Sequence, residues 1–560
     1  MSAFSLLSIG SRAMTANYVA LQTTGNNIAN ANVAGYSRQR VELSTAPSQL
    51  TGGGYIGRGV DVKTISRSHD QFLTREAANA QSNAQMDKTR MTALQKLEDV
   101  FQPGENGLGH AAGQFLNAWT ELASRPADMA VRQTVMARAD EVSDRFAEAA
   151  QRMDASQADV TAGLGEAVKQ VNLLAQGLAQ INQKILSFSG PQGAPNDLLD
   201  ERDRLLNQIS EKLQIKTVMS ADDTTSVFVG DGKPLVMGGN ARQLAVVADP
   251  FDSSRSALAL KDGTGDRLID SEFLGGGVIA GLLQFQNEDL TRARSLLGQM
   301  AATLTRAVNE QQKAGFDLQG EAGQDIFFDF HQPPPNDALA MVRPAASNRD
   351  RTQQPLLTIT DASKLQATEY TLSHDAVSDQ WMLQSSLGGE PVPADQSAPL
   401  LGFSLVGMDA LNTDDRFLLQ PVTYAAGLMR RTLVGPESLA AASKQGSTLV
   451  PNGNALSLAA LADKAIVGVS GSGSGGSTIT EAYASALSDI GTRVQGAVTA
   501  SDISTAVADQ AELRRSSVDG VNLDEEAARL IQSQQAYQAS AKVLQVAQSI
   551  FDTLLQTAAV

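Results

Sequence analysis

The side chains best suited to metal binding or nucleophilic catalysis are scarce in this chain and widely separated. It has only four histidines, none in an H-E-x-x-H pair, and they stand at His69, His110, His331 and His374. Cysteine is absent, which removes thiolate nucleophiles, disulfide bonds and cysteine-ligated metals. We therefore expect no metal centre and no cofactor.

Two glycine-containing segments superficially match nucleotide-binding loops. Gly52, Gly54 and Gly57 satisfy G-x-G-x-x-G, but no hydrophobic strand precedes them, and strand-like residues rather than a helix follow. The run GDGK at 230–233 lacks the spacer of a phosphate-binding loop, and proline follows it. A loop and a hairpin turn, respectively, are the favoured interpretations.

Acidic pairs are the remaining candidates for acid–base chemistry. Asp200/Asp203 and Glu525/Glu526 lie in segments expected to be helical, where we interpret them as solvated helix faces or as first-turn acids favoured by the helix dipole. Because no catalytic constellation forms from these residue types, we predict that the protein is not an enzyme.

The bulk composition restricts the possible partners. A chain of 560 residues exceeds the span of one hydrophobic core, so two to four domains are expected. A net charge of −17, with no run of Lys or Arg longer than two, disfavours nucleic acid and acidic membrane surfaces. No stretch reaches the roughly 18 apolar residues of a membrane span. The start, MSAFSLLSIGSR, makes a poor signal peptide, and the lack of cysteine suits export into an oxidising exterior.

Apolar residues recur every three or four positions at both ends of the chain. The N-terminal stripe comprises Phe4, Leu7, Met14, Tyr18, Leu21 and Ile28, and the C-terminal stripe comprises Leu523, Ala527, Leu530, Tyr537, Ala541, Leu544, Phe551 and Leu555. A mean repeat of about 3.5 residues keeps one helix face turned towards a partner helix, as in coiled coils. We predict that the termini pair with each other and with other copies of the chain.

Neither terminal helix is expected to be stable alone. Full burial of the six large side chains in the N-terminal stripe contributes about 10–15 kcal/mol. Ordering about 25 residues costs roughly 25–50 kcal/mol before hydrogen bonds offset part of it. We therefore hypothesise that both termini are poorly ordered in the free monomer and fold on assembly. The alternative is a pair of amphipathic helices packed on the chain's own core.

Between the termini, helical and strand patterns alternate. Helices are expected at about 69–101, 109–124, 126–160, 164–188, 197–213, 278–314 and 478–513, and extended segments at about 36–68, 215–273 and 345–428. The three prolines at 333–335 and the Gly/Ser run at 470–477 are expected boundaries. The predicted fold class is mainly α with β inserts (α+β), elongated and nested, with a terminal coiled coil, a body of long helices and a projecting β domain.

This pattern divides the chain into three domains. Residues 1–70 with 515–560 are expected to form the terminal coiled-coil domain. Residues 71–344 with 429–514 are expected to form the helical body, which contains a β subdomain at about 215–275. Residues 345–428 are expected to form the small β domain.

The run NNIANANVAGY at 26–36 resembles the N-terminal signature of bacterial flagellar axial proteins, which are rod, hook and hook-associated subunits. The residues that carry this resemblance are Asn27, Asn30, Asn32, Gly35 and Tyr36. Residues 518–528 and 534–542 resemble the C-terminus of the same proteins, with Asp524 as the expected helix N-cap. The runs NDLLDERD at 196–203 and VGDGKPLV at 229–236 resemble the family of the first hook-associated protein, which joins hook to filament.

The resemblance implies a function, a location and a set of partners. Such proteins are exported unfolded through the flagellar type III apparatus and assemble outside the cell, at the distal end of the hook. Their terminal helices form a coiled coil lining the central channel, their helical domains pack in a ring, and the β domain faces outwards. The implied partners are other copies, the hook protein, the second junction protein, and a cytoplasmic export chaperone that covers the C-terminal helix.

Three other functions are left open. A hook or distal-rod subunit shares the first motif but is disfavoured by the long helices at 130–215 and 278–314. A secreted peptidoglycan hydrolase on an axial-protein scaffold would need a paired acid in apolar surroundings, and none stands out. An adhesin would use the β domain at 345–428 to bind host surfaces.

Overall fold

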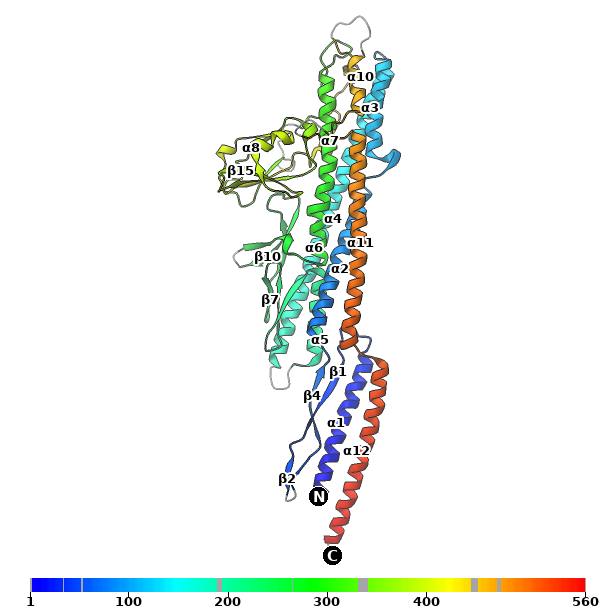
Figure 1. The fold of residues 1–560 in the computed structure, drawn as a ribbon, viewed down its shortest axis with the longest axis vertical. Helices are drawn as coiled ribbons and strands as arrows, with labels where there is room; N and C mark the ends of the chain where they lie inside the picture. The colour runs from blue at the N-terminus through cyan, green and yellow to red at the C-terminus, as the bar shows by residue number, and fades with distance from the viewer. Residues whose placement is uncertain are drawn as a thin grey trace.

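The computed structural model describes residues 3–33, 35–51, 54–188, 194–263, 265–330, 341–444, 452–470 and 475–558. Long helices run parallel to the long axis of a strongly elongated molecule, and two β regions project from one side of it (Figure 1). Both chain ends lie at the same end of the molecule. This arrangement confirms the predicted mainly α fold with β inserts.

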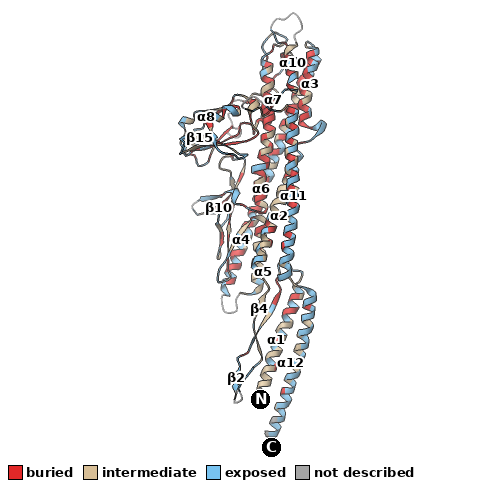
Figure 2. Ribbon diagram, viewed as in Figure 1, coloured by how far each residue is buried: buried red, intermediate tan, exposed pale blue. Residues whose placement is uncertain are grey.

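The helical body surrounds one continuous hydrophobic core. Its helices are α2 (Gln71–Glu98), α3 (Leu108–Ser124), α4 (Met129–Ser187), α5 (Asn196–Lys212), α6 (Gly277–Gln284), α7 (Thr291–Lys313), α10 (Gly453–Ala459) and α11 (Ile479–Asp519). Figure 2 shows the buried residues concentrated along these helices. A separate small hydrophobic cluster between α2 and α11 consists of alanines, which allow close approach of the two backbones: Ala77, Ala80, Ala84, Ala508 and Ala511.

Helix α4 is one unbroken helix of 59 residues, where the sequence suggested two. It begins after Asp128, whose carboxylate accepts hydrogen bonds from the backbone N–H groups of Ala130 and Val131, so Pro126 is not its first residue. Buried positions continue through the expected break, at Val160 and Leu164, and give the helix no reason to end there.

A single π-helical turn (Phe285–Leu290) separates α6 from α7, where one helix was expected. The Thr291 hydroxyl donates to the carbonyl of Gln286 at 3.0 Å and so satisfies a backbone acceptor inside the irregular turn. The turn aims Asp289 into the body, where its fully buried carboxylate accepts two hydrogen bonds from Arg90, at 2.8 and 3.0 Å, and one from Arg493 at 3.1 Å. Asp289, in the turn between α6 and α7, thereby joins these two helices to α2 and α11.

Two β regions are inserted between the helices. The first contains β5 (Ile215–Met219), β6 (Thr225–Val229), β7 (Lys233–Met237) and β8 (Asn240–Ala241) in one antiparallel sheet, and β9 (Leu244–Ala248), β10 (Ser256–Asp262) and β11 (Gly265–Ile269) in another. The second contains β12 (Val342–Pro344), β13 (Leu356–Ile359), β14 (Tyr370–Asp375), β15 (Gln380–Ser385), β16 (Val392–Pro393), β17 (Phe403–Val406) and β18 (Arg416–Leu419).

A buried polar network holds the second β region against the first. Asp252 forms an ion pair with Arg343 at 2.9 Å, and Glu369 forms one with Arg255. The side chain of Gln420 bridges the two pairs by accepting from Arg343 and donating to Glu369. Because these groups are desolvated, breaking one pair would leave a buried charge unpaired. The two ion pairs therefore fix the orientation of the second β region relative to the first.

The lower third of the molecule contains the two ends of the chain. Helices α1 (Ala3–Asn30) and α12 (Leu523–Ala558) run antiparallel to each other. Beside α1 lies a ribbon in which β1 (Gln39–Thr45) pairs with β4 (Val60–Arg67) and ends in a small hairpin of β2 (Gln49–Thr51) and β3 (Gly54–Ile56). No helix among the described residues is long and apolar enough to span a membrane.

Some expectations lie outside the described residues: the boundary at 333–335, residues 471–474 of the Gly/Ser run, Gly52, and the side chain of Phe4. The division into three domains stays a prediction.

Candidate functional site

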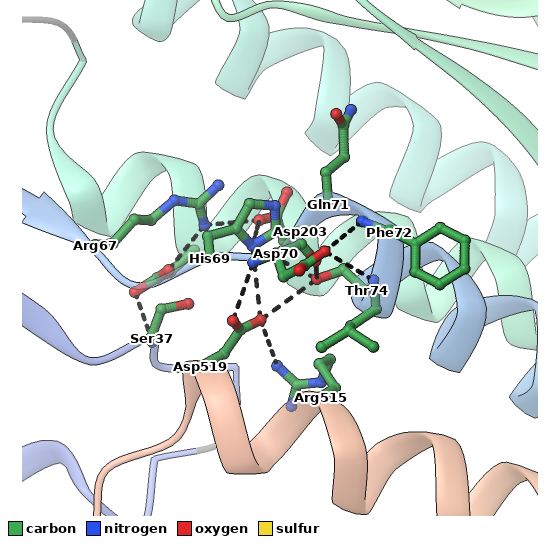
Figure 3. Close-up of polar contacts among 12 residues, drawn as sticks. Ser37, Arg67, His69, Asp70, Gln71, Phe72, Thr74, Asp203, Arg515 and Asp519 are labelled. Atoms are coloured by element: carbon green, nitrogen blue, oxygen red, sulfur yellow. Dashed lines mark hydrogen bonds and ion pairs between the residues drawn. The ribbon is translucent and has the colours of Figure 1, made fainter.

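Polar side chains gather where the terminal helices meet the body (Figure 3). The end of α1, both strands of the ribbon, the start of α2, helix α5, the end of α11 and the start of α12 all contribute to this cluster. We call it the junction cluster. It contains Asn27, Tyr36, Ser37, Arg38, Arg67, His69, Asp70, Asp200, Arg202, Asp203, Asp519, Glu525 and Glu526.

Asn27, from the flagellar motif, is the central residue of the lower half of the cluster. It is almost fully buried, and its amide nitrogen donates to the Gln39 carbonyl and to the Glu526 carboxylate, each at 2.9 Å. Its amide oxygen accepts from the Gln39 N–H at 3.0 Å and from the Tyr36 hydroxyl at 2.9 Å. All four hydrogen-bonding positions of the amide are occupied, so α1, β1 and α12 are held by one side chain.

Glu526 and Arg38 form a buried ion pair beside Asn27. The Arg38 guanidinium contacts Glu526 at 2.7 Å and also the more exposed Glu525 at 2.7 Å. Burial opposes the charge on Arg38, but the hydrogen bonds to Glu525 and Glu526 outweigh it and raise the pKa of Arg38. Burial, with the charges of Asp200, Asp197 and Glu526, raises the pKa of Tyr36 to about 12, so its hydroxyl stays a donor.

Helix α5 supplies two carboxylates to the same cluster. Arg67 contacts Asp200 at 3.1 Å and Asp203 at 2.6 Å, and Asp200 also accepts the Ser37 N–H at 3.1 Å. Burial favours protonation of Asp203, but Arg202, Arg67 and His69 together lower its pKa. Asp200 and Glu526 are buried, so our interpretation of the acidic pairs as solvated faces is wrong for these residues. They face basic side chains from other elements.

Asp519, the last residue of α11, joins that helix to the ribbon and to α2. Its carboxylate accepts the N–H of Asp70, the N-cap of α2, at 3.0 Å, and its carbonyl accepts the N–H of Arg38 at 2.8 Å. Its other carboxylate oxygen lies 3.8 Å from Nδ1 of His69. Burial raises the pKa of Asp519. The chain therefore leaves the body at Asp519, which is hydrogen-bonded both to the start of α2 and to the segment that leads into the ribbon.

The cluster is arranged to hold together the elements that meet in it. Its carboxylates face guanidinium groups or backbone N–H groups. In the parts of the chain that the structure describes, no group of three or more His, Asp or Glu residues could hold a metal ion. Desolvated, mutually paired charges specify one relative placement of the elements that carry them, because every alternative leaves a buried charge unpaired.

His69 makes this cluster pH-sensitive. Burial, and then the charge of Arg67, lower the pKa of His69 below its usual 6.5. The charged groups facing it are Arg67 on β4, Asp70 before α2, Arg202 and Asp203 on α5, and Asp519 on α11, which is itself paired with Arg515. Because the unfolded chain binds a proton near pH 6.5 while the folded chain does not, the stabilisation present above pH 6.5 is lost as the pH falls towards the folded-state pKa.

We therefore expect the wild-type cluster to weaken between pH 7.5 and 5.5, and the variant His69→Gln to lose most of this dependence. Amide hydrogen exchange of residues 70–74, corrected for intrinsic rates, measures the free energy of opening. Asp200 and Asp519, whose pKa values are raised by burial, act in the opposite direction, since protonation removes the cost of burying their negative charge. Equal pH profiles for the two proteins would refute the assignment to His69.

The other motif residues lie at the edge of the cluster. The amide of Asn30 donates only to Asn26, and Asn32 is exposed. Gly35 has a φ of +83°, which favours glycine, and its backbone lies beside the side chain of Arg204. This turn directs Tyr36 back towards Asn27.

The two stripes are brought together only in part. Leu7, Met14, Leu21 and Ile28 are half-buried, but Tyr18 is exposed. On α12, the less exposed positions include Leu530, Tyr537, Ala541, Leu544 and Phe551 from the stripe, whereas Leu523, Ala527 and Leu555 are exposed. Asn522, not Asp524, caps α12, because its side chain accepts the N–H groups of Asp524 and Glu525.

The α1–α12 pair buries little apolar surface. In the described parts of the two helices, the only apolar side chains that are fully buried are those of Ala16 and Ala547. Polar contact between the two helices includes the hydrogen bond from Asn17 to Ser540 at 3.2 Å. Figure 2 shows the same contrast with the body.

Sequence reasoning did not single out Arg38, Arg67 or Asp519, and it misinterpreted Glu526. One signal could have found them: arginine and acidic residues lie within a few positions of predicted helix and strand ends, in a region where the elements must converge. Their pairing, however, depends on contacts between residues hundreds of positions apart.

Models of known families match three parts of the chain. The flagellar hook-associated protein FlgK helical domain matches residues 94–327. The flagella basal body rod protein family matches residues 7–36, and the flagellar basal body rod FlgEFG protein C-terminal family matches residues 517–557. The two rod-type matches therefore contain Asn27 and Glu526, and the hook-associated match contains helices α3 to α7 of the body.

Whole proteins are similar over almost the full length. Flagellar hook-associated protein 1 of Escherichia coli is 32% identical over 98% of this chain and 99% of its own, and that of Salmonella typhimurium is 31% identical with the same coverage. The Bacillus subtilis protein of that name is 28% identical over 59% of this chain and 71% of its own. The solved structure of the flagellar hook junction protein FlgK from Burkholderia pseudomallei has a TM-score of 0.69 at 20% identity, covering 80% of this chain and all of that one, which establishes a shared fold.

Proposed function

This chain belongs to the family of flagellar hook-associated protein 1, and we propose from this that it is the structural subunit joining hook to filament. The observation that carries the proposal is similarity over the full length to hook-associated proteins of two species. A hook or distal-rod subunit is a weaker interpretation, because the rod-type matches are confined to the two ends. The protein is a component of the flagellum that assembles with hook components.

The geometry suits a subunit that transmits force along its length. The terminal helices continue into the body through the junction cluster, where desolvated ion pairs fix their relative placement. Above it, α2 and α11 run side by side along the body, and hydrogen bonds to Asp289 connect both of them to the turn between α6 and α7. A rigid rod with a defined attachment at its lower end is what a junction between two tubes requires.

We further infer that the subunit functions without catalysis, outside the cell, in a ring of copies placed between the hook protein and the second junction protein. The unpaired apolar side chains of α12 support a cytoplasmic chaperone that covers this helix before export, since exposed stripes of this kind aggregate. The projecting β domain would face outwards from such a ring.

Deleting the gene tests the proposal. We expect cells with hooks but without filaments, and flagellin in the culture medium. Plasmid-borne wild-type chain should restore filaments, and electron microscopy of the cells counts them. Filaments growing from the hooks of the deletion strain would contradict the junction assignment.

A further inference from the structure

Among the described residues of the lower third of the molecule, two apolar patches are largely exposed. The first is on the hairpin, where Leu50 and Tyr55 face each other across β2 and β3 and are 66% and 75% exposed. The second is on α12, where Val543, Val546 and Ile550 are 43%, 52% and 41% exposed. On a helix of 3.6 residues per turn, the mean direction of these three residues lies roughly a quarter turn from the mean direction of Leu544 and Ala547, which face α1.

The two patches lie on opposite sides of α1. Helix α1 packs against α12 on one side and against β1 and β4 on the other, and the ribbon and α12 flank it in Figure 1. Hairpin, α1 and α12 thus form three layers, and the apolar patches belong to the two outer layers. No rearrangement of one copy is needed for both patches to meet neighbours at once.

The patches also lie at the same level along the molecule. Gly59 of the ribbon approaches Ile9, and Gly10 of α1 approaches Leu544 of α12. Ala46 is hydrogen-bonded to Gly59, and the chain from Ala46 to Leu50, which enters β2, can extend up to about 13 Å further. From Leu544 to Ile550, α12 extends about 9 Å in the same direction. Copies standing side by side would therefore bring the hairpin of one to the patch of the next.

The charge distribution identifies the occupant as a second copy. Each chain carries a net charge of −17, so copies repel each other wherever their surfaces are charged. Charged residues make up 19% of the chain, yet residues 1–37 contain only Arg12 and residues 530–560 contain only Lys542 and Asp552. Depletion of charge marks the core of protein interfaces. This part of the surface can approach an identical neighbour without repulsion.

The small size of the patches fits a repeated contact in a larger array rather than a stable dimer in solution. A few side chains on each copy cover far less than the about 800 Å² per partner that stable complexes bury. Two copies in dilute solution would not remain together through this contact alone. In an array each copy makes it twice, once with each neighbour, which is the heterologous geometry of rings and helical tubes.

Resting on the proposed function, we propose that the Leu50–Tyr55 pair of one copy packs on Val543, Val546 and Ile550 of the next copy in the assembled junction. Because the chain has no cysteine, engineered cysteines can test this contact without background. The double variant Tyr55→Cys with Ile550→Cys should, after mild oxidation of isolated hook–junction particles, give a ladder of dimers, trimers and higher species. The control, Tyr55→Cys with Ile531→Cys, uses another exposed residue of α12 about 28 Å further along the helix and should give no ladder.

A second measurement tests the same contact if the cysteine variant fails to assemble. Leu50→Lys and Ile550→Glu should each lower the number of filaments per cell at least about tenfold while the subunit is still exported, and their combination should restore at least half of it. Single variants with wild-type filament numbers, or filament-bearing junctions with the first cysteine pair and no ladder, would overturn the contact and leave the junction assignment intact. Failure of the wild-type chain to restore filaments would instead overturn the proposed function.

Discussion

Replacing Asn27 with alanine is expected to abolish most filament assembly. The change removes four hydrogen bonds and leaves the N–H and carbonyl of Gln39 and one side of the buried Glu526 carboxylate without partners. At about 1–3 kcal/mol for each unsatisfied buried group, the junction cluster loses about 3–5 kcal/mol. Since each 1.4 kcal/mol is about a factor of ten in an equilibrium, we expect at least about tenfold fewer filaments per cell. Electron microscopy of complemented deletion cells, with immunoblots of subunit in the medium, provides the measurement.

Asn30→Ala is the matched control for this prediction. Asn30 belongs to the same motif and the same helix, but its side chain contacts only Asn26 at the surface. We expect filament numbers close to wild type, because the lost hydrogen bonds are replaced by water. If the two variants behaved alike, Asn27 would not have the structural role assigned to it.

Replacing Asp289 with alanine is expected to have the largest effect on the stability of the body. The carboxylate is fully buried and pairs with Arg90 and Arg493, which come from α2 and α11. We expect the free energy of unfolding to fall by about 3 kcal/mol, the lower end of the range for breaking a buried pair. The lower end applies because both arginine side chains are about a quarter exposed and can be partly hydrated. Denaturant unfolding followed by circular dichroism at about 222 nm, where helices absorb, measures the change.

Asp159→Ala serves as the surface counterpart. Asp159 pairs with Lys96 at 3.1 Å, but both side chains are about two-thirds exposed. Such pairs contribute about 0.2–1 kcal/mol, so the midpoint should scarcely move. A loss in Asp289→Ala no larger than in Asp159→Ala would show that the π-helical turn does not join the helices as described.

Local periodicity was sufficient to predict most of the helices, because burial on one face leaves a repeat in the sequence. It predicted the terminal helices and most of the body helices to within a few residues, but it missed α10, placed a break near residue 160 in α4 and placed no break at Phe285–Leu290. The π-helical turn is stabilised by tertiary contacts of Gln286 and Asp289, and such contacts leave no periodic signal.

Within the candidate site, only the residues of the family motif could be predicted from the sequence. Asn27, Gly35 and Tyr36 were singled out through the family resemblance, and the structure places Asn27 and Tyr36 in the junction cluster. Asp200 and Glu526 were misinterpreted because an acidic residue on an amphipathic helix looks the same whether it faces water or an arginine from another element. Arg38 and Arg67 lie 488 and 133 positions from the acids they bind, so no local pattern reveals the pairing.

We expect the two ends of the chain to become stable only when copies assemble. Hydrogen exchange of residues 3–30 and 523–558 tests it directly, in dilute full-length subunit and in isolated junction particles. We predict fast exchange of these amides in the free subunit, with only Ala16 and Ala547 as fully buried apolar side chains to protect them, and slow exchange in the particles. Protection in the free subunit equal to that of α4 would contradict this expectation.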